Sequence, residues 1–353
     1  MSFGERQESD TLHNVLVSGA SEDHAILYSF VRGDGLPICR RPGADGQANR
    51  LGWLSASSVL HGRRAANGCT LPGSGDFSFA WYLVQKDVSS FARVCSYDRA
   101  ESAWSDPGPE PRTIRQEAFE IYTALGRAKE RGPFVLVGHS MGGLVMRSFA
   151  EHYPGSTAGL VLVAALSPDT TLGYNGRLVH MREMAKNRPI PGVQTMKTSP
   201  PKLLSEDQRK PRPPVVLGPR YKNLPEEIRQ LQIWAASQPR RTANGEDYLP
   251  EELKEMYEHT QASPHMFGSL PLISIIAMRP DPRPQEVTAE KWDALFQEKV
   301  AEKRGYAELS TNSKVVEADS RHEVHLYDPG TVVTAIREVV EAGRGKLAAN
   351  KRE

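Results

Sequence analysis

The chain has little cysteine, almost no net charge and no long hydrophobic run, and each absence narrows what the protein can be. Its three cysteines are an odd number at irregular spacing, which indicates neither a disulfide framework nor a zinc site. We expect them to be incidental or buried thiols in a reducing compartment. The formal net charge of +1 over 353 residues provides no general attraction for nucleic acid or acidic membranes, so nucleic acid is not an expected partner. The cysteines are Cys39, Cys69 and Cys95.

No segment has the roughly 18 consecutive apolar residues that a membrane-spanning helix needs, so no membrane span is expected. The first ten residues also lack the apolar core of a signal peptide, and we therefore expect a cytoplasmic protein. Hydrophobic residues make up 39% and charged residues 25% of the chain, which is typical of a soluble globular fold.

The most informative segment joins an apolar run to a helix-like pattern through one serine. Val135–Val137 is suited to a strand buried on both faces, and Leu144–Ala150 has the apolar spacing of a helix packed on a sheet. Between them lies the pentad Gly138-His-Ser-Met-Gly142. A sharp strand-to-helix turn of this kind, called the elbow below, needs small residues around a strained Ser140. The Ser140 hydroxyl then projects above the sheet as a nucleophile. The N–H of Met141, at the start of the helix, would point at the oxygen that becomes negative during acyl transfer.

On the basis of this pentad, the sequence resembles the α/β-hydrolase fold superfamily of serine hydrolases, and the resemblance covers about residues 70–342. Arg93–Arg99 and Trp104–Pro109 resemble the strand before the elbow and its following loop, and Asp319–Pro329 is similar to the family's histidine loop. The resemblance implies an α/β fold with a mostly parallel central sheet flanked by helices, and chemistry without a metal or organic cofactor.

The domain organisation follows from this resemblance and from changes of composition. Residues 1–70 are poorly patterned, although Asn14–Val17 and Ala25–Val31 could be early strands. Residues 71–342 form the predicted hydrolase domain, and 343–353 form a charged tail. Within the domain, about 167–268 is charged and proline-rich, at the position where such hydrolases insert a helical cap.

Apolar side chains in the predicted cap either line an acyl pocket or belong to ordinary packing, and the sequence leaves both open. They are Met181, Met184, Met196, Trp234, Met256, Met266 and Phe267.

Two segments are candidates for the second half of the oxyanion hole. Val59–Gly62 has the dipeptide that the family prefers, whereas Leu71–Asp76 has the better spacing, because one short helix fits between it and Tyr97. We favour the second segment, with Gly73 in the turn and the N–H of Ser74 as donor. The residues before it, Asn67–Thr70, are predicted to make a poor buried strand.

Periodicity predicts further elements. Pro111–Arg131 is predicted to be a helix with Thr113 as N-cap and Gln116 as its capping-box partner. Other predicted strands and helices follow from apolar runs and helical spacing. The predicted helices are Phe79–Phe91, Pro225–Ser237, Pro250–Gln261 and Thr331–Ala342, and the predicted strands are Gly159–Ala165, Pro271–Ala277 and Lys314–Ala318.

A serine hydroxyl needs a base, usually a histidine that a carboxylate orients. The resemblance implies His322 as this base, since it follows the last predicted strand, and His325 is the alternative. His139 is expected to support the elbow. The pair His322 and His325 is not a zinc-protease motif, because that motif places its histidines four residues apart with a glutamate beside the first.

The resemblance leaves two positions open for the acid. In many relatives it follows the strand that resumes after the cap, which points to Asp281. In others it ends the strand that enters the cap, where this chain has Ala164 and Ala165 and the nearest carboxylate is Asp169. We favour Asp281 over Asp169, and either could instead cap a turn. Asp98 is expected to tie its loop to the elbow by hydrogen bonds.

The leading hypothesis is a serine hydrolase that acts on carboxylic esters or related small acyl substrates through an acyl-enzyme. Ser140 argues against epoxide hydrolases and haloalkane dehalogenases, whose elbow residue is aspartate, but lactonases, acyltransferases, C–C hydrolases and cofactor-free haloperoxidases share the serine triad. The alternative is a non-catalytic ligand-binding or interaction protein on the same scaffold. The sequence selects no substrate and leaves a homo-oligomer open.

Overall fold

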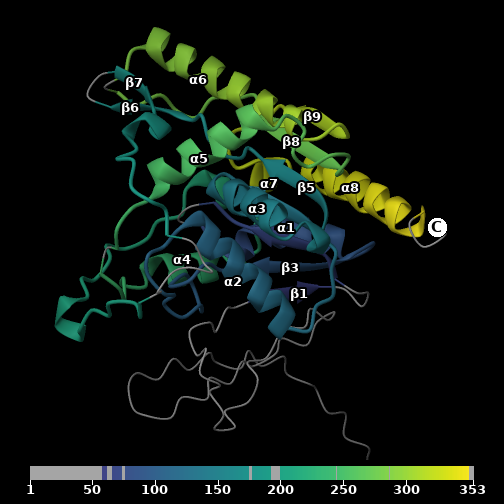
Figure 1. The fold of residues 1–353 in the computed structure, drawn as a ribbon. Coiled ribbons are helices and arrows are strands. Elements are labelled where there is room, and N and C mark those ends of the chain that lie inside the picture. Colours follow the sequence, from purple (N-terminus) through teal and green to yellow (C-terminus); the bar gives the residue numbers. More distant parts are fainter. Residues whose placement is uncertain are drawn as a thin grey trace, which may run out of the picture.

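The computed structural model describes residues 58–61, 66–73, 76–174, 177–191, 199–243, 245–285 and 287–349 (Figure 1). The early strands predicted at Asn14–Val17 and Ala25–Val31 lie outside these residues, as do Cys39 and Ser74. The described strands and helices alternate along the chain through most of the fold, as expected for an α/β protein.

Among the described residues, seven strands form the main sheet in the order β1-β3-β2-β4-β5-β8-β9. The edge strand β1 runs antiparallel to β3, and every other neighbouring pair is parallel. This confirms the predicted mostly parallel sheet. The strands are β1 Ser58–His61, β2 Ala66–Leu71, β3 Arg93–Tyr97, β4 Phe134–His139, β5 Thr157–Val163, β8 Leu272–Ala277 and β9 Ser313–Ala318.

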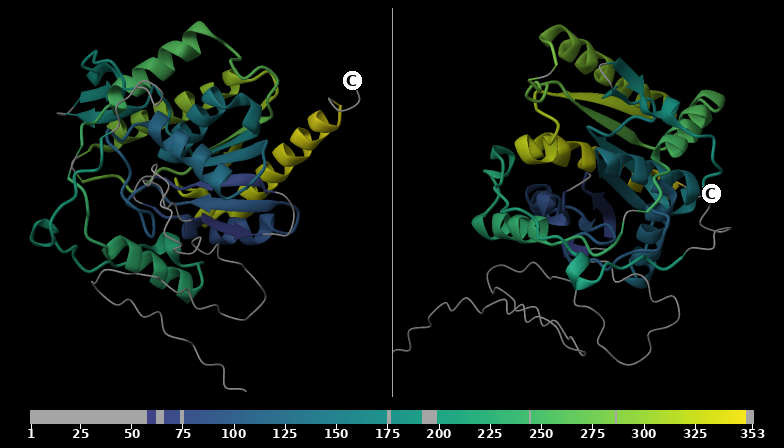
Figure 2. Two further views of the ribbon diagram at one scale, coloured as in Figure 1. Left: turned by 60° about the horizontal axis from the view of Figure 1, so that its bottom comes forward. Right: turned by 90° about the vertical axis from the view of Figure 1, so that its left-hand side faces the viewer.

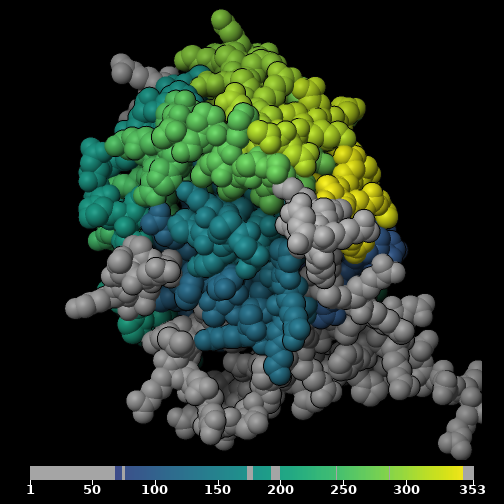
Figure 3. Space-filling model, turned by 45° about the vertical axis from the view of Figure 1, so that its right-hand side comes forward, coloured from purple at the N-terminus to yellow at the C-terminus, as the bar shows by residue number. Residues whose placement is uncertain are grey.

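Helices cover both faces of the sheet, as the views in Figure 2 show. The helices α1 and α8 pack on one face, and α2, α3 and α5 pack on the other. In Figure 3, α2 and α3, in blue, meet the green surface of the segment around α5. The helices are α1 Tyr82–Val88, α2 Ile114–Arg127, α3 Met141–His152, α4 Glu226–Ser237, α5 Leu249–Ala262, α6 Ala289–Arg304, α7 Val324–Tyr327 and α8 Pro329–Ala349.

The central strand β4 shows why its sequence is apolar throughout. Leu136 points into the core with α2 and α3, whereas Val135 and Val137 point into the core with α1 and α8. Successive side chains of a strand face opposite sides of the sheet, so a strand covered on both faces has no position left for a polar side chain. The carboxyl end of this buried strand leads directly into the elbow.

The strand β2 departs from the prediction for Asn67–Thr70, which it includes. It lies between β3 and β4, and Gly68 pairs with Val94 on one side and Val135 on the other. The register shifts between Ala66 and Gly68, so the irregular sequence is accommodated by a local irregularity in the strand. Hydrogen bonds to two neighbouring strands outweigh the weak intrinsic preference of Asn and Gly for strands.

The predicted boundaries of the domain are too narrow at both ends. Because β1 and β2 belong to the main sheet, the domain starts before residue 71. The closing helix α8 continues to Ala349, beyond the predicted end at residue 342.

The amino terminus of α2 follows the prediction in part. The Thr113 hydroxyl accepts a hydrogen bond from the N–H of Gln116 at 3.0 Å, so Thr113 is the N-cap. The Gln116 side chain does not return to Thr113 but donates to Glu120 at 3.1 Å. The reciprocal half of the predicted capping box is therefore replaced by a hydrogen bond within the helix.

The segment between β5 and β8 contains a two-stranded hairpin and two helices. The hairpin pairs β6 Thr171–Tyr174 with β7 Arg177–His180, and the sequence patterns did not predict it. On α4, the ring of Trp234 stacks on the ring of Trp104, with ring centres 5.0 Å apart. In α5, Leu253 and Met256 enter the main core. The predicted cap segment therefore contributes to the packing of the domain itself.

Several apolar side chains that were candidates for an acyl pocket pack on the domain instead. Met256 is buried in the core between the sheet and its helices, and Met181, Met266 and Phe267 pack against the same core. Ordinary packing accounts for these four positions. Met196 lies outside the described residues.

Two of the three cysteines lie among the described residues. Cys69 and Cys95 are neighbours on β2 and β3, both are buried and neither forms a disulfide. Burial raises the pKa of the Cys69 thiol to about 12, so it stays protonated at neutral pH. No helix in the described ranges combines the length and apolarity needed to cross a lipid bilayer.

Candidate active site

Ser140 occupies the strained turn that its pentad predicts. Its backbone has φ +50° and ψ −122°, between the last residue of β4 and the first residue of α3. A non-glycine residue rarely adopts a positive φ, and such strain is typical of functional positions. A Cβ atom on Gly138 would overlap the carbonyl group of Gly142, which explains why this position must be glycine.

The backbone of Ser140 is held from three directions. Its N–H donates to the carbonyl of Val163 at 3.1 Å, and its own carbonyl accepts from Gly143 at 2.9 Å and from Leu166 at 3.0 Å. The elbow is thus fixed between the end of β5 and the first turn of α3. The N–H groups at the start of a helix have no partner within that helix, so the N–H of Met141 is suited to hold an oxyanion.

The favoured oxyanion segment lies directly against this elbow. A Cβ atom on Gly73 would lie 2.8 Å from the Nδ1 of His139 and 3.1 Å from the Cβ of Ser140. The described residues therefore bring Gly73 and Ser140 together, while Ser74 lies outside them. Val59–His61, at the start of the other candidate segment, lies in the antiparallel edge strand β1, beyond β3.

Arg99 anchors the segment that contains Gly73, a role that the sequence did not reveal. Its guanidinium donates to the carbonyl oxygens of Gly73 at 2.9 Å and Pro72 at 3.0 Å. Glu117 on α2 holds the same guanidinium at 2.8 Å. In the sequence, the only indication of this role is that Arg99 follows Asp98 directly after β3.

His322 lies beside the elbow in the loop between β9 and α7. Its carbonyl oxygen is 3.0 Å from the Nε2 of His139, and the two imidazole rings have centres 4.7 Å apart. Burial lowers the pKa of His322 to about 4, the charge of Lys303 acts in the same direction, and Asp281 acts in the opposite one. A neutral imidazole at pH 7 is the form that can accept a proton. Between the described side chains of Ser140 and His322 the structure records no hydrogen bond.

The two candidate acids have different surroundings. Asp281 follows β8, is exposed, and its charge acts on both His322 and Lys303. Asp169 is instead engaged by Arg182, whose Nε lies 2.6 Å from its carboxylate, and by His180 at 3.1 Å. This arrangement favours Asp281 as the partner of His322.

His325, the alternative base, is fully buried beneath the site. Its ring stacks on Trp81 with centres 4.7 Å apart and lies 4.5 Å from the ring of His139. Its Nε2 is 3.9 Å from the carboxylate of Asp76, beyond hydrogen-bonding distance. Complete burial separates His325 from substrate and makes it a packing partner of His139.

His139 is enclosed between the other two histidines. Burial, followed by the influence of His325 and His322, holds the pKa of His139 well below its ordinary value. Because a carbonyl oxygen can only accept, the Nε2 of the neutral ring must donate to His322. His139 therefore supports the histidine loop as well as the elbow, which refines its expected role.

Asp76 is a further buried group that sequence reasoning did not single out. Its carboxylate accepts hydrogen bonds from the N–H of Phe77 at 2.9 Å and from the Gln232 side chain at 3.0 Å. Although burial acts to raise the pKa of Asp76, its interaction with His325 and these hydrogen bonds lower it below its ordinary value. Asp76 thus links the segment after Gly73 to α4 and α7.

Asp98 is structural, although its partner differs from the one predicted. It accepts from the N–H of Ser78 at 2.7 Å and from the Ser78 hydroxyl at 2.9 Å. These bonds tie the end of β3 to the short helix η1 Ser78–Trp81 and not to the elbow itself.

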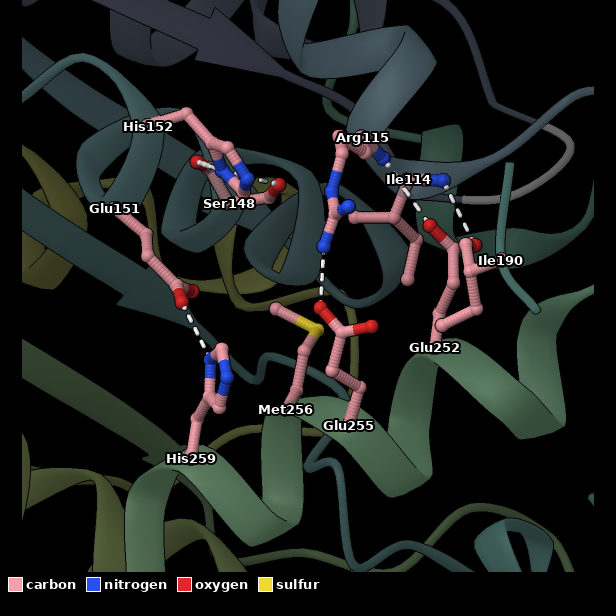
Figure 4. A pocket seen from close by; sticks show the side chains of 10 residues that line it. All are labelled: Ile114, Arg115, Ser148, Glu151, His152, Ile190, Glu252, Glu255, Met256 and His259. Atoms are coloured by element: carbon pink, nitrogen blue, oxygen red, sulfur yellow. Dashed lines mark hydrogen bonds and ion pairs between the residues drawn. The ribbon is translucent and has the colours of Figure 1, made fainter. Parts of the chain in front are cut away.

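Away from the elbow, a pocket lies between the start of α2, the far half of α3 and α5 (Figure 4). Burial raises the pKa of Glu252 there to about 8, and its carboxyl group accepts from the N–H groups of Ile114 and Arg115. Ser148 and His152 also line this pocket, but the Nδ1 of His152 lies 2.8 Å from the Ser148 carbonyl. Ser148 has an ordinary place within α3, so this pocket offers no activated nucleophile.

Comparison with known proteins agrees with this geometry. The sequence model described as "Alpha/beta hydrolase family" matches residues 60–335, which include the elbow and the histidine loop. Among solved structures, a thermophilic esterase from Thermogutta terrifontis is similar with a TM-score of 0.50 and 19% identity, over 82% of this chain and 93% of that one. A probable hydrolytic enzyme from Pseudomonas aeruginosa PAO1 has a TM-score of 0.50 and 17% identity, over 81% and 89% of the chains. At such identities, these structures support the fold alone.

Curated relatives match over shorter parts of their length. An uncharacterised protein of Schizosaccharomyces pombe is 34% identical over 97 residues, which are 28% of this chain and 18% of the relative. The "Probable transporter efuK" of Hormonema carpetanum is 24% identical over 290 residues, covering 78% of this chain and 39% of the relative. The chain therefore spans less than half of the length of these relatives.

Proposed function

Because the chain belongs to the alpha/beta hydrolase family, we propose that it is a serine hydrolase that cleaves carboxylic esters or related acyl compounds through an acyl-enzyme. The observation that carries this proposal is the backbone of Ser140, with φ +50° and ψ −122° at a strand-to-helix turn. Such strain presents a hydroxyl above the sheet and beside the first N–H groups of a helix.

In the proposed reaction, the Ser140 oxygen attacks the acyl carbon while its proton passes to the imidazole of His322. The C–O bond of the substrate then breaks, and the protonated imidazole returns the proton to the departing alcohol. A water molecule repeats the attack on the acyl-enzyme and releases the acid. The lowered pKa of His322 supports its role as the group that begins neutral.

The remaining groups of the site stabilise charge. The N–H of Met141, and that of Ser74 in the segment at Gly73, would hold the oxyanion. Asp281 would orient the imidazole and stabilise its charged form. Asp281 is exposed, and the described residues show no hydrogen bond between Asp281 and His322. For this role, the Asp281 side chain would have to turn toward His322.

Covalent labelling by a fluorophosphonate tests this proposal directly. We expect the purified protein to be labelled in a time-dependent manner, and Ser140→Ala and His322→Ala to lose both labelling and turnover of p-nitrophenyl esters. Ser148→Ala is a matched control, because it removes a serine that also lies beside a histidine, on the helix α3 that follows Ser140. Labelling that persists in folded Ser140→Ala would contradict the assignment, and the preferred ester chain length would size the acyl pocket.

One observation favours a second function, that of a non-catalytic ligand-binding protein on the same scaffold. In the described chain, Ser140 and His322 are neighbours without a mutual hydrogen bond, and Asp281 is exposed. A triad disassembled in solution would leave Ser140 weakly nucleophilic. A folded wild-type protein that neither reacts with fluorophosphonate nor hydrolyses esters would support this alternative.

A further inference from the structure

Three side chains that could bind a cation converge between the hairpin and α6. His180 ends β7, and Glu298 and Glu302 lie one helical turn apart on α6. Each offers one ligand atom, and these atoms all lie within 4.8 Å of one another. Residues four apart on a helix share a face, so α6 presents both carboxylates to the hairpin.

The imidazole of His180 has a defined orientation in this cluster. Its Nδ1 lies 2.8 Å from the carbonyl oxygen of Asp169 and 3.1 Å from the Asp169 carboxylate. Both are acceptors, so Nδ1 carries the proton, and in the neutral ring Nε2 keeps its lone pair. That Nε2 is 3.8 Å from the Glu298 carboxylate. A carboxylate that orients a histidine through its other nitrogen is typical of metal ligands.

Neither glutamate forms a salt bridge with lysine or arginine within the described ranges, although the charge of Glu302 acts on Lys303 on the same helix. Thr171 donates to Glu298 through its hydroxyl at 2.6 Å and to Glu302 through its N–H at 3.1 Å. The second carboxylate oxygen of Glu302 is shielded from solvent and has no hydrogen-bond partner. The neighbouring Arg182 pairs with Asp169, and no ion pair with lysine or arginine reaches either glutamate within the described ranges. Burying a carboxylate oxygen that has no hydrogen-bond donor costs free energy unless a cation or a proton is present.

We propose that His180, Glu298 and Glu302 bind a divalent transition-metal ion, with Zn²⁺ as the preferred ion. One imidazole nitrogen and two carboxylate oxygens suit Zn²⁺, which forms bonds of about 2.0–2.2 Å to these donors and completes its shell with water. An all-oxygen cage, which Ca²⁺ or Mg²⁺ would need, is not present in this cluster.

The ion would hold the β6–β7 hairpin against α6, because its ligands come from both elements. Its ligand atoms must approach more closely than their present separation, so binding draws β7 toward the helix. The same helix carries Lys303, whose charge acts on His322. The proposed ion would therefore stabilise the hairpin within the predicted cap segment, and it takes no part in the proposed ester chemistry.

Metal binding by the full chain tests this inference. The chelator-treated protein is titrated with ZnCl₂ by calorimetry and by competition with a chromophoric chelator, with MnCl₂ and CaCl₂ for comparison. We expect one Zn²⁺ per chain, weaker binding of Mn²⁺, still weaker binding of Ca²⁺, and a Zn²⁺-dependent rise in melting temperature. Glu302→Gln, which preserves shape, and His180→Ala should each weaken Zn²⁺ binding at least tenfold.

The controls separate this cluster from other histidines. His259→Ala removes a histidine that pairs with Glu151 at 2.9 Å, and it should bind Zn²⁺ as the wild type does. His322→Ala should also retain the site. The inference is overturned if the wild type binds no Zn²⁺, or if Glu302→Gln and His180→Ala, shown to be folded by circular dichroism, bind it with unchanged affinity.

Discussion

The lowered pKa of His322 predicts an unusual pH dependence for a hydrolase whose base is a histidine. With a pKa of about 4, about 97% of the imidazole is neutral at pH 5.5, whereas an ordinary value of about 6.5 would leave about 9% neutral. Since kcat/KM follows the ionisation of the free enzyme, it should stay near its plateau at pH 5.5 instead of falling about tenfold.

The structural cause of this shift can be tested by a second change. The charge of Lys303 contributes to the lowered pKa of His322, after burial. In Lys303→Met the midpoint of the pH profile should therefore move upward. Lys314→Met is a suitable control, because Lys314 pairs with Glu338 on α8 at 2.8 Å and is not among the charges that act on His322. Its pH profile should match that of the wild type.

The assay should measure kcat/KM for a small ester between pH 4 and pH 8, with product separated by chromatography because p-nitrophenol itself titrates in this range. Ser140→Ala supplies the background rate at each pH. A wild-type midpoint near pH 6.5 would refute the argument that burial controls His322. A midpoint that does not move in Lys303→Met would refute the electrostatic part alone.

Folding stability must be followed in the same range. The pKa of His322 is lower in the folded state than in the unfolded state, so between about 6.5 and about 4 the unfolded chain binds more protons. Its contribution to the free energy of unfolding is complete above this window and declines as pH falls through it, by at most about 3.4 kcal/mol. Activity recovered after return to pH 7 distinguishes ionisation from irreversible unfolding.

Three further predictions, each based on substitutions, test other parts of the site and core. Gly73→Ala should lower kcat/KM by at least about 100-fold in ester assays, because its Cβ would lie 2.8 Å from the Nδ1 of His139 at the elbow. Gly126 has open space around it, so Gly126→Ala is the control. This control should raise the free energy of unfolding by about 1 kcal/mol in urea denaturation. Asp281→Asn should lower kcat strongly and Asp169→Asn should not, and the opposite ranking would reassign the acid. Leu136→Ala, which removes a fully buried side chain, should reduce the free energy of unfolding by about 2–5 kcal/mol, and a loss below about 1 kcal/mol would contradict the described packing.

Local patterns were sufficient to predict the strained turn at Ser140 and most regular elements. The elbow was predictable because a strained turn requires glycine at fixed neighbours of Ser140, a constraint that is local in the sequence. The strand β4 was predictable because burial on both faces removes the polar alternation. Thr113 was predictable as an N-cap because the bond it accepts spans only three residues.

The tertiary structure decided the features that depend on distant parts of the chain. Asn67–Thr70 forms a strand because β3 and β4 supply hydrogen bonds from both sides, which local propensity does not contain. The sequence favoured Asp281 over Asp169 only by its position after a strand. Folding brings Arg182 and His180 to Asp169, whereas the charge of Asp281 acts on His322.

The sequence by itself determined the family of fold and the serine, because both depend on spacing along one segment and on buried apolar runs. Only the tertiary structure decided how Arg99 anchors the turn at Gly73 and how Asp76 and His325 lie beneath the elbow. It also brought His180 to Glu298 and Glu302, more than a hundred residues away. Contacts of this kind are made by side chains from separate elements, and their distances exist only after the sheet and its helices have packed.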